Sequence, residues 1–288
     1  MLISVDDIIK SKSYIEIFPD IINFKKDYRE LIPTVHPDKC KDPDAQEATK
    51  ILNKYKDQIE NGIKYLDDSG EITYFPLRCI MSGDAVLLKN SLESFRLINL
   101  AKKKTWKLFP SYLPSSIIKE GDTLRASFDE RSLPLLGLQL EENHIVWILS
   151  RLLEFITYLH SMRISHNGLN PGSVYITPKM HCIKIISFYH STRLDYKSMK
   201  NKNIATKFPS FYTKISPDTI EALDIECAKK IAIYLLGDKH GFGTRFKKLK
   251  KGLSSFLQTY HTNSFIAFDE YRKMVDKNYK KQFIPLNI

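Results

Sequence analysis

The chain has 288 residues, of which 43% are hydrophobic, and its formal net charge at pH 7 is +11. This composition excludes a disordered chain, and no apolar run reaches the roughly 18–20 residues that span a bilayer. The first residues, MLISVDDIIK, include acidic side chains where a secretory signal is basic, so we expect a cytoplasmic protein without membrane contact. At this length a second domain is expected.

Metal-binding patterns are not found in the sequence. The four cysteines are scattered and include no C-x-x-C pair, which predicts neither a zinc site nor a disulfide framework: Cys40, Cys79, Cys182 and Cys227. Four histidines lack the carboxylate or cysteine company of a metal site, and we interpret them as structural or exposed: His160, His166, His181 and His190. We therefore expect no metal and no cofactor.

The charge is unevenly distributed along the chain. Residues 1–62 contain ten Lys and Arg against twelve Asp and Glu, a net charge of −2, so the remainder carries +13. Basic clusters with aromatic neighbours lie at 101–107 and 244–251, and such clusters can bind nucleic acid through its phosphates. We favour a solvated basic face, because no nucleic-acid-binding motif accompanies the charge.

Two helices are predicted in the first sixty residues. Residues 24–35, FKKDYRELIPTV, place apolar side chains at helical spacing: Tyr28, Leu31, Ile32 and Val35. Residues 41–62 repeat this spacing and end at a glycine that is suited to stop a helix: Ala48, Ile51, Leu52, Tyr55, Ile59 and then Gly62. The polar loop between them predicts an antiparallel helical hairpin.

The loop of this hairpin reads TVHPDKC, residues 34–40. Within its helical frame, it resembles the J-domain of DnaJ-type co-chaperones over about residues 10–62. The resemblance implies a small all-α domain over residues 1–64 that binds a DnaK-type heat-shock ATPase and stimulates its hydrolysis of ATP. It assigns chaperone binding to seven residues: Lys25, Lys26, Arg29, His36, Pro37, Asp38 and Lys39. The alternative is a plain loop whose proline and aspartate only begin the next helix.

The residue types at this corner explain the implied role. Pro37 fixes its own φ and keeps His36 out of helical conformation, which gives a stiff, exposed corner. Asp38 then offers a carboxylate for a charged hydrogen bond to an arginine of the partner. Lysines on the preceding helix steer an acidic partner towards it. Pro33 is expected to bend that helix. Two acidic residues are expected to dilute its positive face: Asp27 and Glu30.

After Gly62 the pattern changes from helices to strands. We predict two strands around a turn at 82–84, a third strand over 94–100 and a fourth over 122–128. A long helix is predicted over 141–162, where apolar side chains form one stripe: Ile145, Ile148, Leu149, Leu152, Ile156 and Leu159.

Residues 164–176, ISHNGLNPGSVYI, resemble the catalytic loop of protein kinases, H-R-D-L-x-x-x-N. His166, Leu169 and Pro171 match the pattern that the family shows in this loop. The arginine, the aspartate base, the lysine and the metal-binding asparagine of the family are replaced in turn by Asn167, Gly168, Asn170 and Ser173.

The resemblance continues in order to about residue 240. The D-F-G triplet of the family is replaced by Ser187, Phe188 and Tyr189. Residues 216–218 stand where A-P-E belongs, and Asp224 stands at the anchoring aspartate of the next helix. The implied fold class is α+β in two domains. A J-domain helical hairpin (1–64) and a linker (65–71) precede a reduced bilobal kinase-like domain (72–288), with lobes of about 72–130 and 131–288.

The kinase-like domain lacks the chemistry of phosphoryl transfer. That reaction needs a base near the acceptor hydroxyl and ligands for magnesium beside the phosphates. Gly168 cannot accept a proton, and Ser173 and Ser187 are poor ligands for a hard cation. Lys89 is the candidate for the nucleotide-pairing lysine, but no glutamate is well placed to pair with it. The sequence therefore predicts a pseudokinase that is not an enzyme.

The leading functional hypothesis is a co-chaperone or adaptor. Its J-domain recruits a DnaK-type chaperone, and its pseudokinase domain binds a protein client or regulatory partner. Two alternatives stay open at this point. One is a kinase-fold transferase with non-standard nucleotide chemistry, and the other is a nucleic-acid-associated protein that uses the basic second domain.

Overall fold

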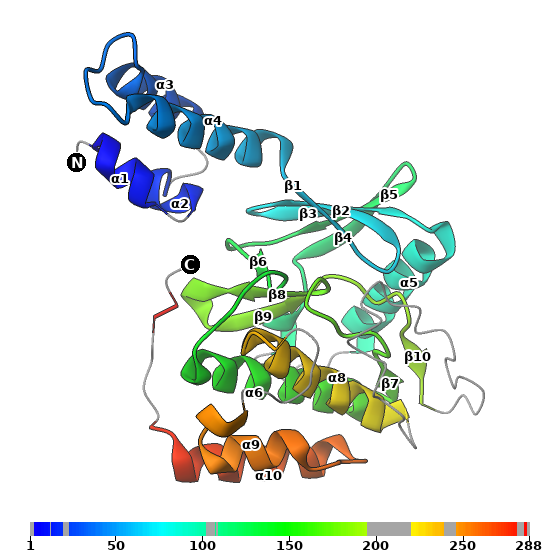
Figure 1. The fold of residues 1–288 in the computed structure, drawn as a ribbon. Helices are drawn as coiled ribbons and strands as arrows, with labels where there is room; N and C mark the ends of the chain where they lie inside the picture. The colour runs from blue at the N-terminus through cyan, green and yellow to red at the C-terminus, as the bar shows by residue number, and fades with distance from the viewer. Residues whose placement is uncertain are drawn as a thin grey trace. The chain divides into compact units, whose positions relative to one another are not determined.

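The computed structural model describes residues 3–11, 13–19, 23–101, 107, 109–194, 220–238, 246–280 and 285–286. They belong to two compact units of a mixed α+β chain, whose elements are drawn in Figure 1. Unit 1 comprises residues 1–65, 73–76 and 288, and unit 2 comprises residues 66–72 and 77–287. Three predictions fall wholly or mostly outside the described residues: the basic cluster at 101–107, the A-P-E equivalent at 216–218 and the start of the basic cluster at 244–251.

Unit 1 is built on four helices: α1 Val5–Lys10, α2 Tyr14–Ile17, α3 Phe24–Val35 and α4 Ala45–Asn61. The last two are the helices predicted from apolar spacing. Ser4 caps α1 in a capping box with Asp7. α1 and α3 both pack against α4, and the buried side chains between them form the core of the unit: Ile8, Tyr14, Ile17, Phe18, Phe24, Val35, Leu52 and Tyr55.

A five-stranded sheet follows, with the order β1-β2-β3-β5-β4. Its strands are β1 Ile63–Leu66, β2 Gly70–Phe75, β3 Arg78–Gly83, β4 Ser116–Glu120 and β5 Thr123–Ser127. β5 pairs antiparallel with both β3 and β4. Residues 65–71, expected as a linker, instead contain the end of β1, a turn and the start of β2. The fourth predicted strand, over 122–128, is present as β5.

The prediction of strands after the turn at 82–84 and over 94–100 is wrong. These residues form one helix, α5 Ala85–Ala101. Asp84 begins it, because its Oδ1 accepts hydrogen bonds from the amides of Val86 and Leu87 at 2.8 and 3.0 Å, as an N-cap residue does. The buried side chains recur every three or four residues and not every two: Leu88, Ser91, Leu92, Phe95 and Ile98.

The rest of unit 2 is built around α6 Glu142–Ser161, the predicted long helix, which packs against α8 Ile220–Leu235 and α10 Ser264–Asn278. Two small sheets accompany these helices, with orders β6-β8-β9 and β10-β7. Their strands are β6 Leu133–Pro134, β7 Ile164–Ser165, β8 Val174–Thr177, β9 Cys182–Ile185 and β10 Thr192–Arg193. The remaining elements are η1 Phe109–Tyr112, η2 Pro178–Met180, η3 Phe246–Lys248 and α9 Lys251–Gln258.

Within the described ranges, no helix is both long and apolar enough to cross a membrane. The same ranges contain no group of three or more His, Cys, Asp or Glu side chains arranged to hold a metal ion.

Candidate functional site

The corner after α3 presents the histidine-proline-aspartate tripeptide. α3 ends at Val35, and His36 has extended backbone, with φ −67° and ψ 135°. The carbonyl oxygen of His36 accepts hydrogen bonds from the amides of Lys39 and Cys40 at 2.9 and 2.8 Å. The His36 Nδ1 lies 3.4 Å from Asp38 Oδ2, and the Asp38 side chain is 84% exposed. A carboxylate therefore stands at a turn whose backbone is hydrogen-bonded, open to a partner.

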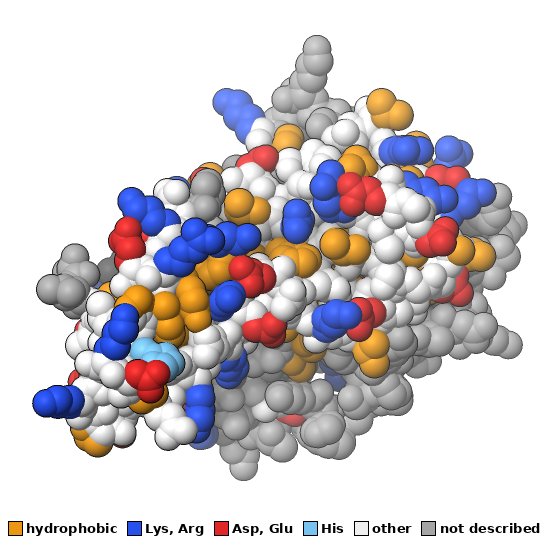
Figure 2. Space-filling model, turned by 90° about the horizontal axis from the view of Figure 1, so that it is seen from above, with side chains coloured by type: hydrophobic (Ala, Val, Ile, Leu, Met, Phe, Trp, Pro, Cys, Tyr) orange, Lys and Arg blue, Asp and Glu red, His pale blue; other side chains and the backbone are white. Residues whose placement is uncertain are grey.

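Basic side chains line α3 before this corner. Lys25, Lys26 and Arg29 are all exposed. Lys25 Nζ lies 3.9 Å from Glu60 Oε1, and Lys26 Nζ lies 4.0 Å from Glu30 Oε1. Contacts this long between exposed groups are weak, so the lysines remain available to a partner. Figure 2 shows Lys and Arg side chains beside a strip of hydrophobic ones on the side of the molecule seen from above.

The two acidic residues of α3 lie near each other. Both Asp27 and Glu30 line a pocket of about 670 Å³ together with Phe18 and Leu31. Glu30 also lies beside Lys26, with its Oε1 4.0 Å from the Lys26 Nζ. The dilution of the basic face by these two carboxylates stays a prediction.

In unit 2, the loop that resembles a catalytic loop is organised by one buried carboxylate. Asp224, on α8, is 0% exposed. Its Oδ2 accepts from Ser165 Oγ and the His166 amide at 2.8 Å each, and from His160 Nε2 at 3.1 Å. Its Oδ1 accepts from the Asn167 amide at 2.7 Å. Burial acts to raise the pKa of Asp224, but these hydrogen bonds outweigh it, so the pKa is lowered and the carboxylate stays ionised.

His166 joins this loop to the segment that replaces D-F-G. Its Nε2 donates to the Ser187 carbonyl oxygen at 2.9 Å, and its ring lies 5.3 Å from that of Phe188. The Phe188 amide donates to Ser91 Oγ on α5 at 2.9 Å. Full burial lowers the pKa of His166 to about 4, so its ring is neutral near pH 7. These contacts hold the loop at 165–168 against the segment at 187–188 and against α5.

Asn170 and Ser173 form hydrogen bonds with each other. The kinase resemblance places them where the family has a lysine and the metal-binding asparagine. The Asn170 Oδ1 accepts from the amides of Gly172 and Ser173 at 2.8 and 3.0 Å. The Ser173 Oγ accepts from the Asn170 amide and donates to the Asn170 carbonyl oxygen, both at 3.0 Å. Both side chains are buried. Their polar atoms are therefore used inside the loop.

The ring of His190 covers Gly168, which the kinase resemblance places where the family has its catalytic base. A Cβ added at Gly168 would lie 2.7 Å from Cδ2 of His190. An aspartate cannot occupy this position unless the histidine moves. The ring of His190 therefore occupies the space that a side chain at residue 168 would use.

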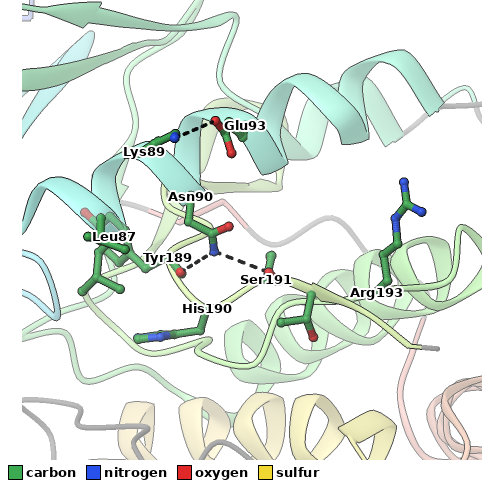
Figure 3. A pocket seen from close by; sticks show the side chains of 10 residues that line it. Leu87, Lys89, Asn90, Glu93, Tyr189, His190, Ser191 and Arg193 are labelled. Carbon is green, nitrogen blue, oxygen red and sulfur yellow. Dashed lines mark hydrogen bonds and ion pairs between the residues drawn. The ribbon is translucent and has the colours of Figure 1, made fainter. Parts of the chain in front are cut away.

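Lys89 lies on a helix, whereas the nucleotide-pairing lysine of protein kinases lies on a strand. It lies on α5, is 75% exposed, and its Nζ is 3.8 Å from Glu93 Oε1 one turn later. Both side chains and Arg193 line a pocket of about 590 Å³, and Figure 3 shows Lys89 and Glu93 on one helix with Arg193 apart from them. In the same view, the Asn90 amide nitrogen reaches the carbonyl oxygens of Tyr189 and Ser191, at 2.6 and 3.4 Å.

Sequence reasoning missed several residues that hold this site. Asn90 and Ser91 were missed because strands, and not a helix, were predicted around them. In a helix, Ser91 falls on the buried stripe as a polar residue, which would have been conspicuous. His160 was interpreted only as structural or exposed. It falls four residues after Ile156 on the buried stripe of α6, a position where a polar ring needs a buried partner, which is Asp224.

Unit 2 should lose about 2 kcal/mol of stability between pH 7 and pH 5 because of His166. The unfolded residue binds a proton with a pKa of 6.5, while the folded one does so only at about 4. Between these values the unfolded state binds more protons, so stability falls as the pH falls. Urea unfolding followed by tryptophan fluorescence measures this, because Trp147 lies on α6 of unit 2 and the sequence of unit 1 contains no tryptophan.

The matching variant is His166→Gln, which cannot titrate and should flatten this part of the pH profile. His36→Gln, in exposed surroundings of unit 1, serves as the control and should leave the profile of unit 2 unchanged. Equal slopes for wild type and His166→Gln would contradict the assignment.

Comparisons with known proteins give structural similarities only. No protein-family model matches the chain, and no curated protein matches it either. Among solved structures, the chain is similar to titin kinase with its flanking domains, with 13% identity and a TM-score of 0.44, over 75% of this chain and 44% of that chain. It is also similar to vaccinia related kinase 3, with 12% identity and a TM-score of 0.45, over 75% of this chain and 90% of that one.

Proposed function

We propose that the protein is a co-chaperone or adaptor. Unit 1 acts as a J-domain that recruits a DnaK-type heat-shock ATPase and stimulates it, and unit 2 is a catalytically inactive, kinase-like scaffold that binds a protein client or regulatory partner. The observation that carries this proposal is the corner at residues 36–38. There an 84% exposed carboxylate directly follows a helix with an exposed basic face.

The Asp38 carboxylate contributes little to the stability of unit 1. Its Oδ2 lies 3.4 Å from His36 Nδ1, and a contact between side chains that are 84% and 42% exposed contributes at most about 1 kcal/mol. An arginine of a partner can form two parallel hydrogen bonds to a carboxylate presented in this way. Lys25, Lys26 and Arg29 add attraction for an acidic surface beside that arginine.

The proposal of a kinase-like scaffold is supported by the buried hub at Asp224. The resemblance identifies this residue as the anchoring aspartate, and it holds the amides of His166 and Asn167, which lie 58 and 57 residues earlier in the chain. The contact of His166 with Phe188 also supports the proposal, because the resemblance assigns both residues to positions that pack the kinase core. The scaffold is therefore retained at the positions that pack, while the positions that react have changed.

Phosphate transfer from ATP, to the protein itself or to generic substrates, should stay at background. The expectation extends to Gly168→Asp, because the restored carboxylate would meet the ring of His190 and would still lack magnesium ligands. Incorporation of radiolabelled phosphate measures this. A signal that a single substitution at Lys89 or Ser187 abolishes would show that the protein is an enzyme.

Affinity capture of the intact protein beside its Asp38→Asn variant tests whether unit 1 binds the chaperone and unit 2 binds the other partners. A DnaK-type chaperone should be captured by the wild type and lost from the variant. Partners retained by both are clients or regulators of unit 2. Capture of the same chaperone by both proteins through ATP-sensitive binding would contradict the role given to the corner.

A further inference from the structure

Unit 2 contains a second cavity, of about 340 Å³, which shares no lining residue with the pocket beside α5. Its walls come from η1, α6, η2 and β9 and from the residues that follow β5. Apolar side chains line part of it: Pro110, Tyr112 and Met180. Small-molecule sites have volumes of about 300–1,000 Å³, so this cavity is large enough for a small organic molecule.

One buried charge lines this cavity. Lys184, on β9, is 7% exposed, and its Nζ donates to the carbonyl oxygens of Ser111 and Leu113 at 3.2 and 3.1 Å. These distances exceed the roughly 2.7–2.9 Å of strong charged hydrogen bonds, and an ammonium group has a third N–H to donate. Within the described part of the chain, no carboxylate lies at ion-pair distance from Nζ. Burial lowers the pKa of Lys184, so its desolvation is not fully offset by these carbonyl groups.

The other charged side chains of the cavity are paired or open to water. Arg151 Nη1 lies 3.1 Å from Glu154 Oε2, and Glu130 Oε1 lies 3.5 Å from Lys179 Nζ. Asp129 is exposed, so water screens its charge. Lys184 is therefore the charged group of this cavity for which a counter-ion would be worth most.

We propose that this cavity binds a small organic carboxylate, whose charge is recognised by Lys184 and whose body lies against the apolar side chains. The carboxylate would accept the third N–H of Lys184 and supply the missing negative charge. A carboxylate suits the site better than a phosphate, because a phosphate needs several donors at once. A free organic acid and the C-terminus of a peptide both present this chemistry. The site belongs to unit 2 alone and does not depend on chaperone recruitment.

Ligand-observed fluorine NMR of the full chain with para-trifluoromethylbenzoate tests the site, beside the neutral amide of the same compound. The benzoate should bind with a dissociation constant in the millimolar range or tighter, as suits a ligand of this size. The amide should bind at least about tenfold more weakly, because it carries no negative charge. Tighter binding by a short peptide that ends in phenylalanine with a free C-terminus, but not by its amidated form, would identify a peptide as the source of the carboxylate.

Four substitutions test the role of the buried lysine. Lys184→Met should weaken binding of the benzoate at least about tenfold, whereas Asp129→Asn, which removes a like charge, should bind it at least as tightly as the wild type does. Because Lys184→Met also removes two internal hydrogen bonds, Met180→Glu and Met180→Gln provide a second comparison at a residue that is 60% exposed. The glutamate variant should bind the benzoate more weakly than the glutamine variant. Lys273→Met, on α10, removes an exposed charge elsewhere and should change nothing.

Three results would overturn the proposal. They are no binding of the benzoate or the free peptide by the wild type, equal binding of the benzoate and its amide, and unchanged binding by both Lys184→Met and Met180→Glu. Lys184 would then only attach η1 to β9 through its two carbonyl contacts. None of these measurements involves a DnaK-type ATPase, so the outcome is separate from that of the chaperone proposal.

Discussion

Asp38→Asn should abolish stimulation of a DnaK-type ATPase while leaving unit 1 folded. Asparagine is nearly isosteric with aspartate, and the side chain is 84% exposed, so the free energy of unfolding should change by no more than about 0.5 kcal/mol. The interaction should fail because the amide carries no negative charge and presents a donor where the partner's arginine needs an acceptor. Single-turnover ATP hydrolysis, with wild type and variant side by side, measures the effect.

The same loop offers a matched control for this substitution. Asp42 is also exposed, and its Oδ1 accepts a hydrogen bond from the Asp44 amide at 2.9 Å, which an asparagine can preserve. Asp42→Asn should therefore stimulate the ATPase as the wild type does. Equal stimulation by wild type and Asp38→Asn, or none by the wild type with any DnaK-type protein of its native host, would reduce the tripeptide to a turn between two helices. The nucleic-acid hypothesis for the basic unit 2 would then gain weight.

Asp224→Ala should destabilise unit 2 by about 3–5 kcal/mol, the range found when one member of a buried charged network is removed. The substitution leaves three donors without an acceptor, two of them backbone amides that cannot turn towards water, whereas Ser165 Oγ can still donate to Asn167 Oδ1 at 2.7 Å. The loop at 165–168 should lose its fixed position as a consequence. Urea unfolding followed by tryptophan fluorescence reports on this unit, because Trp147 lies on its helix α6 and the sequence of unit 1 contains no tryptophan.

Two further variants sharpen this prediction. Ser165→Ala removes one of the four donors and keeps the carboxylate satisfied by the others, so its cost should be about 1 kcal/mol. Asp269→Ala removes an exposed carboxylate that pairs with Lys273 on α10, and should cost less than about 0.5 kcal/mol. If Asp224→Ala cost no more than Asp269→Ala, the hub would not organise the loop.

The pH dependence of this hub has a defined sign. Because the folded pKa of Asp224 is lowered, its contribution to stability is fully present above the unfolded value of 3.8 and is lost as the pH falls below it. The loss due to His166 begins higher, near pH 6.5, where the unfolded histidine starts to bind a proton. Acid should therefore destabilise unit 2 in two successive steps.

What the sequence determined by itself was local in the chain. The helices at 24–35 and 45–61, the corner at 36–38 and the long helix α6 could all be predicted, because each depends on the spacing of apolar side chains or on the fixed φ of a proline within a few residues. The glycine at residue 168, where the kinase resemblance expects an aspartate, could also be identified directly, because recognising an absent side chain needs no structure.

The tertiary structure decided what lies opposite each of these residues. Residues 84–101 could be mistaken for strands because a short apolar run such as 85–88 cannot be told from a strand by periodicity alone, whereas the buried side chains over the whole segment follow a helical spacing. The partners of Asp224 lie 57 to 64 residues away, and those of Asp68 and Ser69 lie more than a hundred residues away. Pairings over such distances follow no local rule, because the folded chain brings together side chains that the sequence separates.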